Sequence, residues 1–130
     1  MINKLVNSVR KFQEASGQIV SDYPQIPDDD TAELRHALIT EETSEFFDAW
    51  MEDDLLGIAD ALGDIMYVVV GCALAYGIDL DEVMKEICRS NDTKYIQGKV
   101  QKDENGKVKK PPHYSPPNLE KVIWFCKCCS

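Results

Sequence analysis

The chain has 130 residues, of which 44% are apolar and 28% are charged, so it can bury a core within a single domain. This composition excludes a disordered chain, a collagen-like chain and a scaffold held by disulfides alone. The net charge is −9 and the sequence pI is near 4.6, which argues against nucleic acid as the main partner because a phosphate backbone requires a basic face.

The sequence predicts neither a membrane-spanning segment nor a secretory signal. The longest uninterrupted apolar stretch, residues 65–78, is shorter than the roughly 20 residues of a membrane-spanning helix. The N-terminus lacks the charged and apolar regions of a secretory signal. We therefore predict a cytoplasmic protein with no membrane partner and with reduced cysteines, three of which (Cys126, Cys128 and Cys129) fall in a Cys-rich tail at residues 126–130.

Apolar residues at helical spacing predict four main helices in the first 90 residues. They are expected at residues 2–16, about 31–50, about 55–76 and 80–89. Asp30 and Glu33 have the spacing of a capping box ahead of the second helix, and Asp79 with Glu82 repeats this spacing at the start of the fourth. Gly77 is the expected C-terminal stop of the third helix.

The sequence changes character after the fourth helix. An Asn105-Gly106 turn predicts a short hairpin within a lysine-rich segment, and four prolines between residues 111 and 117 impose an extended arm. Asn118 is placed to cap a last short helix at residues 119–125. We predict one all-α domain at residues 1–125, with a helical core at 2–90 and a C-terminal arm at 91–125.

Charge is distributed unevenly along the chain. Residues 28–64 hold thirteen acidic residues and one base, Arg35, whereas residues 89–110 hold seven bases and three acids. An acidic half beside a basic half suits a metal-bound polyphosphate ligand. Two solvated faces of opposite charge would give the same counts.

The second helix carries the most specific signal, the segment Glu41-Glu42-Thr43-Ser44-Glu45. On a helical wheel Glu42 and Glu45 project from the apolar face, with Glu41 at its edge. Burying an ionised carboxylate without a partner is very costly, so such groups are normally paired with a cation or a metal.

The third helix is apolar around almost its whole circumference, which predicts burial on nearly all sides. Asp60 and Asp64 are its charges, and their spacing of four residues places them on one face. Small residues stacked along that face leave space for a ligand: Gly57, Gly71 and Ala75. If this helix packs antiparallel to the second, both aspartates would lie opposite Glu42 and Glu45 in an all-oxygen site for Mg²⁺ or Mn²⁺.

Two other interpretations of these acids remain open. In the first, Asp60 and Asp64 pair with Arg35 or Arg89 in the core. In the second, the glutamates belong to a ferritin-like di-iron site, but that site needs Glu-x-x-His, and neither His36 nor His113 has this spacing.

Together these motifs resemble the all-α nucleoside triphosphate pyrophosphohydrolases, the MazG-like and phosphoribosyl-ATP pyrophosphohydrolase-like group. The first family motif, Glu-Glu-x-x-Glu, matches residues 41–45. The second is usually Glu-x-x-Asp, and Ala61-Leu62-Gly63-Asp64 lacks its first acid, for which Asp60 is the nearest substitute. The similarity covers about residues 9–123, including the segments 89–94 and 106–114.

The resemblance implies Mg²⁺-dependent (or Mn²⁺-dependent) hydrolysis of a nucleoside triphosphate between its α and β phosphates, a reaction that cleans nucleotide pools. It assigns the metal ligands to Glu42, Glu45, Asp64 and Asp60, and it lets Glu41 accept the proton of the attacking water or bind a second ion. The positions similar to phosphate contacts of the family are Asn91 and Lys94, with Arg89 and Lys107 as helpers. It also implies a homodimer or homotetramer, as expected from helices this apolar.

Two alternative functions stay open. Hydrolysis of phosphoribosyl-ATP would break the same bond in another substrate, and a non-enzymatic helical interaction module could use the acids as a metal-stabilised site. Base and sugar specificity are not predicted, because the pocket would be made by Phe12, Gln13, Trp50 or Tyr67 in an arrangement that spacing does not resolve.

Overall fold

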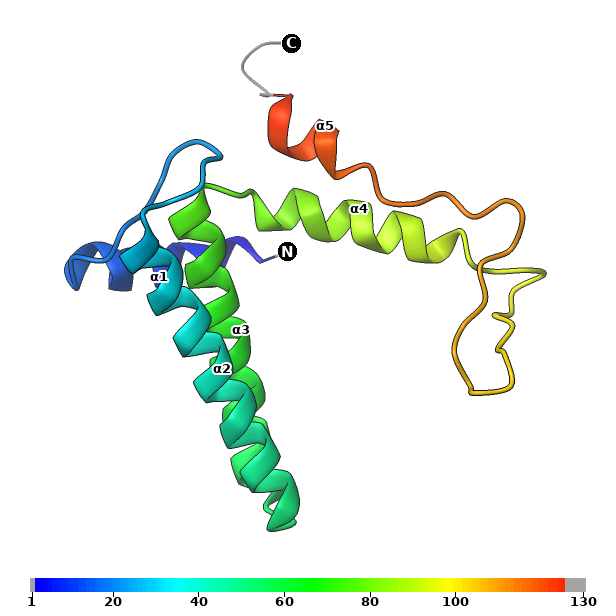
Figure 1. Cartoon of the computed structure of the whole chain (residues 1–130), viewed down its shortest axis with the longest axis horizontal. Coiled ribbons are helices and arrows are strands. Elements are labelled where there is room, and N and C mark those ends of the chain that lie inside the picture. The colour runs from blue at the N-terminus through cyan, green and yellow to red at the C-terminus, as the bar shows by residue number, and fades with distance from the viewer. Residues whose placement is uncertain (1, 126–130) are drawn as a thin grey trace. The chain divides into compact units, whose positions relative to one another are not determined.

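The computed structural model describes residues 2–125, which form two compact units divided between Ile78 and Asp79. Its helices are α1 (Asn3–Ala15), α2 (Asp29–Met51), α3 (Leu55–Tyr76), α4 (Leu80–Asp92) and α5 (Leu119–Trp124) (Figure 1). The described residues contain isolated β-bridges and no strand. The predicted all-α class, with four main helices and a short fifth one, is confirmed. The predicted Cys-rich tail lies outside the described residues.

The first unit is built on a hairpin of two long helices. A three-residue turn joins α2 to α3, so the two helices run antiparallel and side by side (Figure 1). Small side chains let them approach closely, since Ala49 and Ala61 are buried and a Cβ at Gly57 would lie 3.1 Å from that of Ala49. The shorter α1 packs against α3, where Val9 is completely buried. This packing fixes which faces of α2 and α3 can meet.

The connection between α1 and α2 is tied to the end of α3. Ser21 N donates to Leu74 O at 2.9 Å and Gln25 N donates to Tyr76 O at 3.0 Å, so two carbonyls in the last turn of α3 accept hydrogen bonds from the connection. Gly77 ends α3 in the left-handed conformation, as predicted, with φ of 68°. A side chain at Gly77 would collide with the carbonyl of Tyr23, so the glycine is also required by this close approach.

The capping box predicted at Asp30 and Glu33 is wrong. The N-cap of α2 is Asp28, whose carboxylate accepts from Thr31 N at 3.4 Å and from Thr31 Oγ1 at 2.6 Å. Asp29 and Asp30 therefore lie in the first turn, where the helix dipole favours negative charge. The caps predicted at Asp79 and Asn118 are confirmed, because each side chain accepts a hydrogen bond from the backbone N–H three residues later.

The second unit is organised around a buried carboxylate on α4. The Glu86 side chain is 5% exposed, and it accepts hydrogen bonds from Arg89 and from the backbone N–H of Asn118, each at 2.8 Å. Lys121 of α5 pairs with the same carboxylate at 3.1 Å. The predicted hairpin is present as a single antiparallel bridge, Lys102 to Val108, closed around Gly106 with φ of 78°.

Burial of α3 is less complete than its sequence predicts. Leu55, Leu56, Leu62 and Met66 are between 50% and 84% exposed, because α1 and α2 cover only part of the helix. In the part of the chain that the structure describes, α3 is the one helix that is long enough and apolar enough to cross a membrane, judged by length and composition alone. A core helix of a soluble protein meets the same test, so this is weak evidence for a membrane span.

Candidate functional site

Three carboxylates from two helices converge in the first unit. Glu42 and Glu45 lie one turn apart on α2, and Asp64 lies on the antiparallel α3. One carboxylate oxygen from each residue can be chosen so that all three lie within 4.8 Å of one another. Glu42 and Asp64 are partly buried and Glu45 is exposed. We refer to these three residues as the acidic trio.

The environment of Glu42 favours a cation beside it. Burial raises the pKa of Glu42, and the negative charges of Glu45 and Asp64 raise it further. Its Oε2 atom is buried and has no hydrogen-bond partner among the described residues. Carboxylate oxygens are the ligands that hard divalent cations prefer, so the acidic trio fits such an ion and would be relieved of repulsion by it.

The structure does not bring the other two predicted acids into the trio. Asp60 is exposed and lies one helical turn before Asp64 on α3. The two aspartates share a face of α3, but they lie at different positions along the helix axis, and only Asp64 joins the glutamates of α2. Glu41 is exposed on α2, close enough to Glu42 for its charge to contribute to the raised pKa of that residue.

The predicted alternative in which core arginines neutralise these aspartates is wrong. Arg35 donates to Gln13 Oε1 at 3.0 Å and to Gln18 Oε1, and Arg89 pairs with Glu86. The described residues of this unit form no salt bridge with the acidic trio, so they leave its charge uncompensated.

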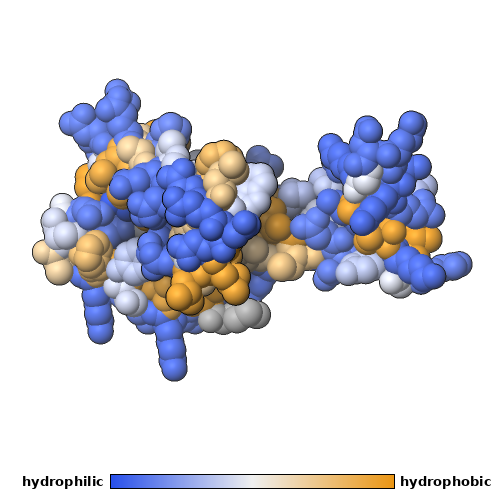
Figure 2. Space-filling view, turned by 90° about the horizontal axis from the view of Figure 1, so that it is seen from below, coloured by the Kyte–Doolittle hydropathy of each residue, from blue (hydrophilic) through white to orange (hydrophobic). Residues whose placement is uncertain are grey.

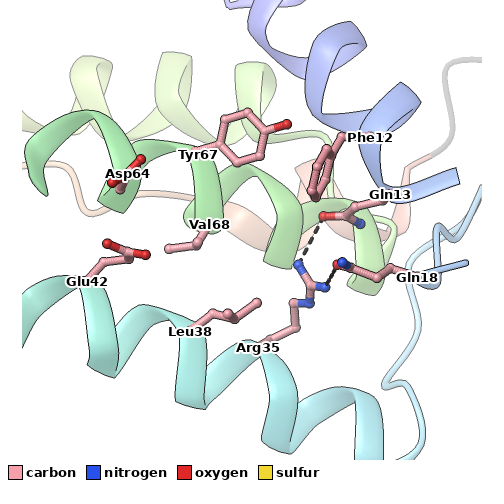
Figure 3. A pocket seen from close by; sticks show the side chains of 9 residues that line it. All are labelled: Phe12, Gln13, Gln18, Arg35, Leu38, Glu42, Asp64, Tyr67 and Val68. Atoms are coloured by element: carbon pink, nitrogen blue, oxygen red, sulfur yellow. Dashed lines mark hydrogen bonds between the residues drawn. The ribbon is translucent and has the colours of Figure 1, made fainter. Parts of the chain in front are cut away.

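A pocket of about 320 Å³ extends from the acidic trio (Figure 3). It is lined by side chains from α1, the following connection, α2 and α3: Phe12, Gln13, Gln18, Arg35, Leu38, Glu42, Asp64, Tyr67 and Val68. Figure 3 shows the carboxylates of Glu42 and Asp64 at one end and Arg35 with both glutamines at the other. Tyr67 lies between the ends, and its ring meets that of Phe12, which lies beside Gln13, edge to face with centroids 5.8 Å apart.

The pocket includes three of the four residues that sequence reasoning named for it. Phe12, Gln13 and Tyr67 line it, whereas Trp50 is 57% exposed and packs edge to face against Phe47, with ring centroids 5.6 Å apart. Trp50 lies near the end of α2, beyond the acidic trio, and so does not reach the cavity.

Sequence reasoning missed Arg35 and Gln18 as pocket residues. A signal for Arg35 was available, since residues seven apart on a helix share a face and Arg35 precedes Glu42 by seven. No comparable signal existed for Gln18, which lies in the connection after α1 and is placed only by the tertiary fold.

The residues predicted to contact phosphate lie in the second unit. The Arg89 guanidinium also donates to Ser115 Oγ and Pro116 O, each at 3.0 Å, so it holds the extended arm against α4. Asn91 donates to Ile87 O at 3.1 Å, and Lys94 lies 5.8 Å from the ring centroid of Tyr114. Lys107 is exposed. The phosphate-binding role of these residues stays a prediction.

Comparison with known proteins identifies the family of the chain. Residues 9–91 match the model of the phosphoribosyl-ATP pyrophosphohydrolase family, and this match covers more than half of the chain. The chain belongs to this family. It is therefore a member of the MazG-like all-helical nucleoside triphosphate pyrophosphohydrolase superfamily, as its motifs predicted. The matched segment contains the whole acidic trio and every residue that lines the pocket.

The chain is also similar to a viral protein of unknown function. An uncharacterized protein of Acanthamoeba polyphaga mimivirus is 51% identical over 51 residues, which make up 39% of this chain. The aligned part covers 20% of that viral protein, so this chain spans about a fifth of its length.

Proposed function

We propose that this protein is a divalent-cation-dependent pyrophosphohydrolase that cleaves a ribo- or deoxyribonucleoside triphosphate between its α and β phosphates. The products would be the nucleoside monophosphate and pyrophosphate. The observation that carries the proposal is the position of the acidic trio: its three carboxylates lie within 4.8 Å of one another, and two of them, Glu42 and Asp64, line one end of a pocket that also holds two aromatic rings. Membership of a pyrophosphohydrolase family supports it independently.

Glu42, Glu45 and Asp64 would hold the cation, and Mg²⁺ or Mn²⁺ matches this set of oxygen ligands. When bound, such an ion neutralises phosphate charge and orients a water molecule. Glu41 is the exposed neighbour of Glu42 on α2, and we assign to it the acceptance of the proton from the attacking water. The water oxygen would form a bond to the α-phosphorus, the bond from that phosphorus to the α–β bridging oxygen would break, and pyrophosphate would leave.

The remaining pocket residues suit the nucleoside part of the substrate. Phe12 and Tyr67 offer aromatic surface, and Leu38 and Val68 exclude water from the same region. Phosphoribosyl-ATP offers the same bond, and the family match supports it as a substrate equally well.

A substrate panel tests the reaction. Purified protein with Mg²⁺ is incubated with each ribo- and deoxyribonucleoside triphosphate and with phosphoribosyl-ATP, and the products are separated by chromatography. We expect a monophosphate and pyrophosphate from at least one substrate. A diphosphate with inorganic phosphate would contradict the assignment of the bond, and no product from any substrate would favour a metal-stabilised interaction module.

We also propose that a second copy of the chain covers the exposed apolar side of the helix hairpin. Leu55 and Leu56 are 77% and 84% exposed, and Leu62 and Met66 on the same helix are 50% and 56% exposed. Hydrophobic residues reach the surface beside strongly hydrophilic ones in Figure 2. Apolar residues exposed along a core helix are typical of subunit interfaces, so we expect a dimer or tetramer.

A further inference from the structure

The pocket ends, away from the acidic trio, on a buried guanidinium that has only neutral partners. Arg35 is 3% exposed, and its Nη1 and Nη2 atoms donate to the side-chain oxygens of Gln13 and Gln18 (Figure 3). Its Nε atom is buried without a hydrogen-bond partner among the described residues. A buried charge in such surroundings is costly, so this end of the pocket favours a ligand that accepts hydrogen bonds.

The two glutamines differ in whether their side-chain N–H donors remain available to a ligand. Because arginine can only donate, the atom of each glutamine that faces it must be the carbonyl oxygen, which fixes the orientation of both amides. The Gln13 amide nitrogen donates to Ile19 O at 3.2 Å, so both ends of that side chain are used within the protein. Gln18 Nε2 makes no hydrogen bond to the described residues and keeps its N–H donors for a ligand.

The distance between the two ends of the pocket matches the reach of a nucleotide. Arg35 lies seven residues before Glu42 on α2, which places the two Cα atoms about 10 Å apart along the helix. A nucleoside monophosphate spans a comparable length from its phosphate to the outer edge of its base. With the phosphate at the acidic trio, the base edge therefore reaches Gln18 and Arg35, beside Phe12 and Tyr67.

On the basis of the proposed nucleotide hydrolysis, we propose that Gln18 and Arg35 select the nucleobase, taking a base that presents two adjacent hydrogen-bond acceptors. Cytosine presents O2 and N3, and guanine presents O6 and N7. Adenine places its amino donor beside N7, and thymine and uracil place an N–H donor between their carbonyls. The groups that Gln18 and Arg35 leave unpaired are N–H donors, so a base donor placed against them would be buried and unpaired, which costs more than the lost bond.

Binding of reaction products separates this inference from the proposed hydrolysis. The four deoxynucleoside monophosphates are titrated into the full chain with Mg²⁺, and their affinities are measured by calorimetry. We expect dCMP and dGMP to bind about tenfold or more tightly than dAMP and dTMP, the discrimination typical of a paired base contact.

The sharpest variant is Gln18→Glu, which replaces the amide donor by acceptor oxygens while keeping a hydrogen bond to Arg35. It should shift the ratio of affinities about tenfold toward dAMP and dTMP. Gln18→Met, which has similar length and no amide, should remove the preference without reversing it. Gln101→Glu makes the same charge change at an exposed glutamine outside the pocket and should keep the wild-type order. Circular dichroism checks that each variant is folded.

An unchanged order of affinities in both Gln18 variants would overturn the inference, as would no binding of any monophosphate or equal binding of all four to the wild type. If the expected order is found and no triphosphate releases pyrophosphate, the proposed hydrolysis fails and the base selection stands. If pyrophosphate is released without base preference, only the base selection fails.

Discussion

Gly71 of α3 lies so close to Arg35 of α2 that a Cβ on the glycine would stand 2.7 Å from the arginine Nη1 atom. The same Cβ would collide with the side-chain oxygen of Gln13. The space that the sequence leaves at Gly71 is thus filled by the hydrogen-bonded pair of Arg35 and Gln13, whose two residues are almost fully buried. This contact joins α1, α2 and α3 beside the pocket.

Gly71→Ala should therefore destabilise the protein, because the added methyl group must displace the guanidinium or the amide. We expect a loss of about 1–3 kcal/mol in the free energy of unfolding, as for other overpacked sites. Urea denaturation followed by circular dichroism measures it. Gly63→Ala is the matched control on the same helix, since a Cβ there has nothing within 4 Å, and it should be neutral or stabilising by up to about 1 kcal/mol. Equal stability of the two variants would refute the close contact.

Neutralising one member of the acidic trio should abolish activity without lowering the stability of the metal-free protein. Two carboxylates this close repel by roughly 1–3 kcal/mol, with the exposed Glu45 near the lower figure. Glu45→Gln and Asp64→Asn should abolish turnover and leave the metal-free melting temperature unchanged or higher. Added Mg²⁺ should raise the melting temperature of the wild type, because it binds only the folded site, and raise it much less in either variant.

Asp48→Asn is the control for these variants, because Asp48 is an exposed acid on α2 outside the trio. It should keep both turnover and the Mg²⁺ response. If Glu45→Gln and Asp64→Asn melt well below the wild type without metal and respond to Mg²⁺ as it does, the acids serve a structural role and the proposed site is wrong.

Acid should loosen the second unit through Glu86. Its hydrogen bonds from Arg89 and from Asn118 N, together with that from Lys121, lower the pKa of Glu86 from 4.5 to about 2. The pKa of Glu86 is lower in the folded state than in the unfolded state. This carboxylate therefore stabilises the fold fully above about pH 4.5, and the stabilisation is lost as the pH falls toward 2. Glu86→Gln should therefore melt below the wild type at neutral pH, and the difference should shrink across this window. A difference that stays constant from pH 7 to about pH 2 would contradict the assignment.

Self-association should depend on the exposed leucines of α3. Light scattering after gel filtration should show a dimer or larger at micromolar concentration, and Leu56→Glu should shift it to the monomer because it places a charge in an apolar interface. Ile26→Glu makes the same kind of change at a residue that is 83% exposed and lies outside the helix hairpin, and it should keep the assembly. A wild-type monomer would contradict the proposed interface.

Local chemistry explains why several elements could be predicted from the sequence alone. The caps at Asp79 and Asn118 and the stop at Gly77 depend on hydrogen bonds and backbone angles within four residues, so their residue types indicate the helix ends directly. The start of α2 was predicted two residues late because three consecutive aspartates can each cap a helix, and local sequence does not rank them.

The sequence by itself determined the helices, the faces that carry Glu42, Glu45 and Asp64, and the family to which these motifs belong. Helical periodicity gives the direction in which a side chain points, but it does not give the register along the axis between two packed helices. The tertiary structure alone therefore decided that Asp64 joins the glutamates while Asp60 stays exposed. It also decided that Arg35 meets two glutamines in place of a carboxylate, since Gln13 and Gln18 reach it from a distant part of the chain through the packing of α1 on α3.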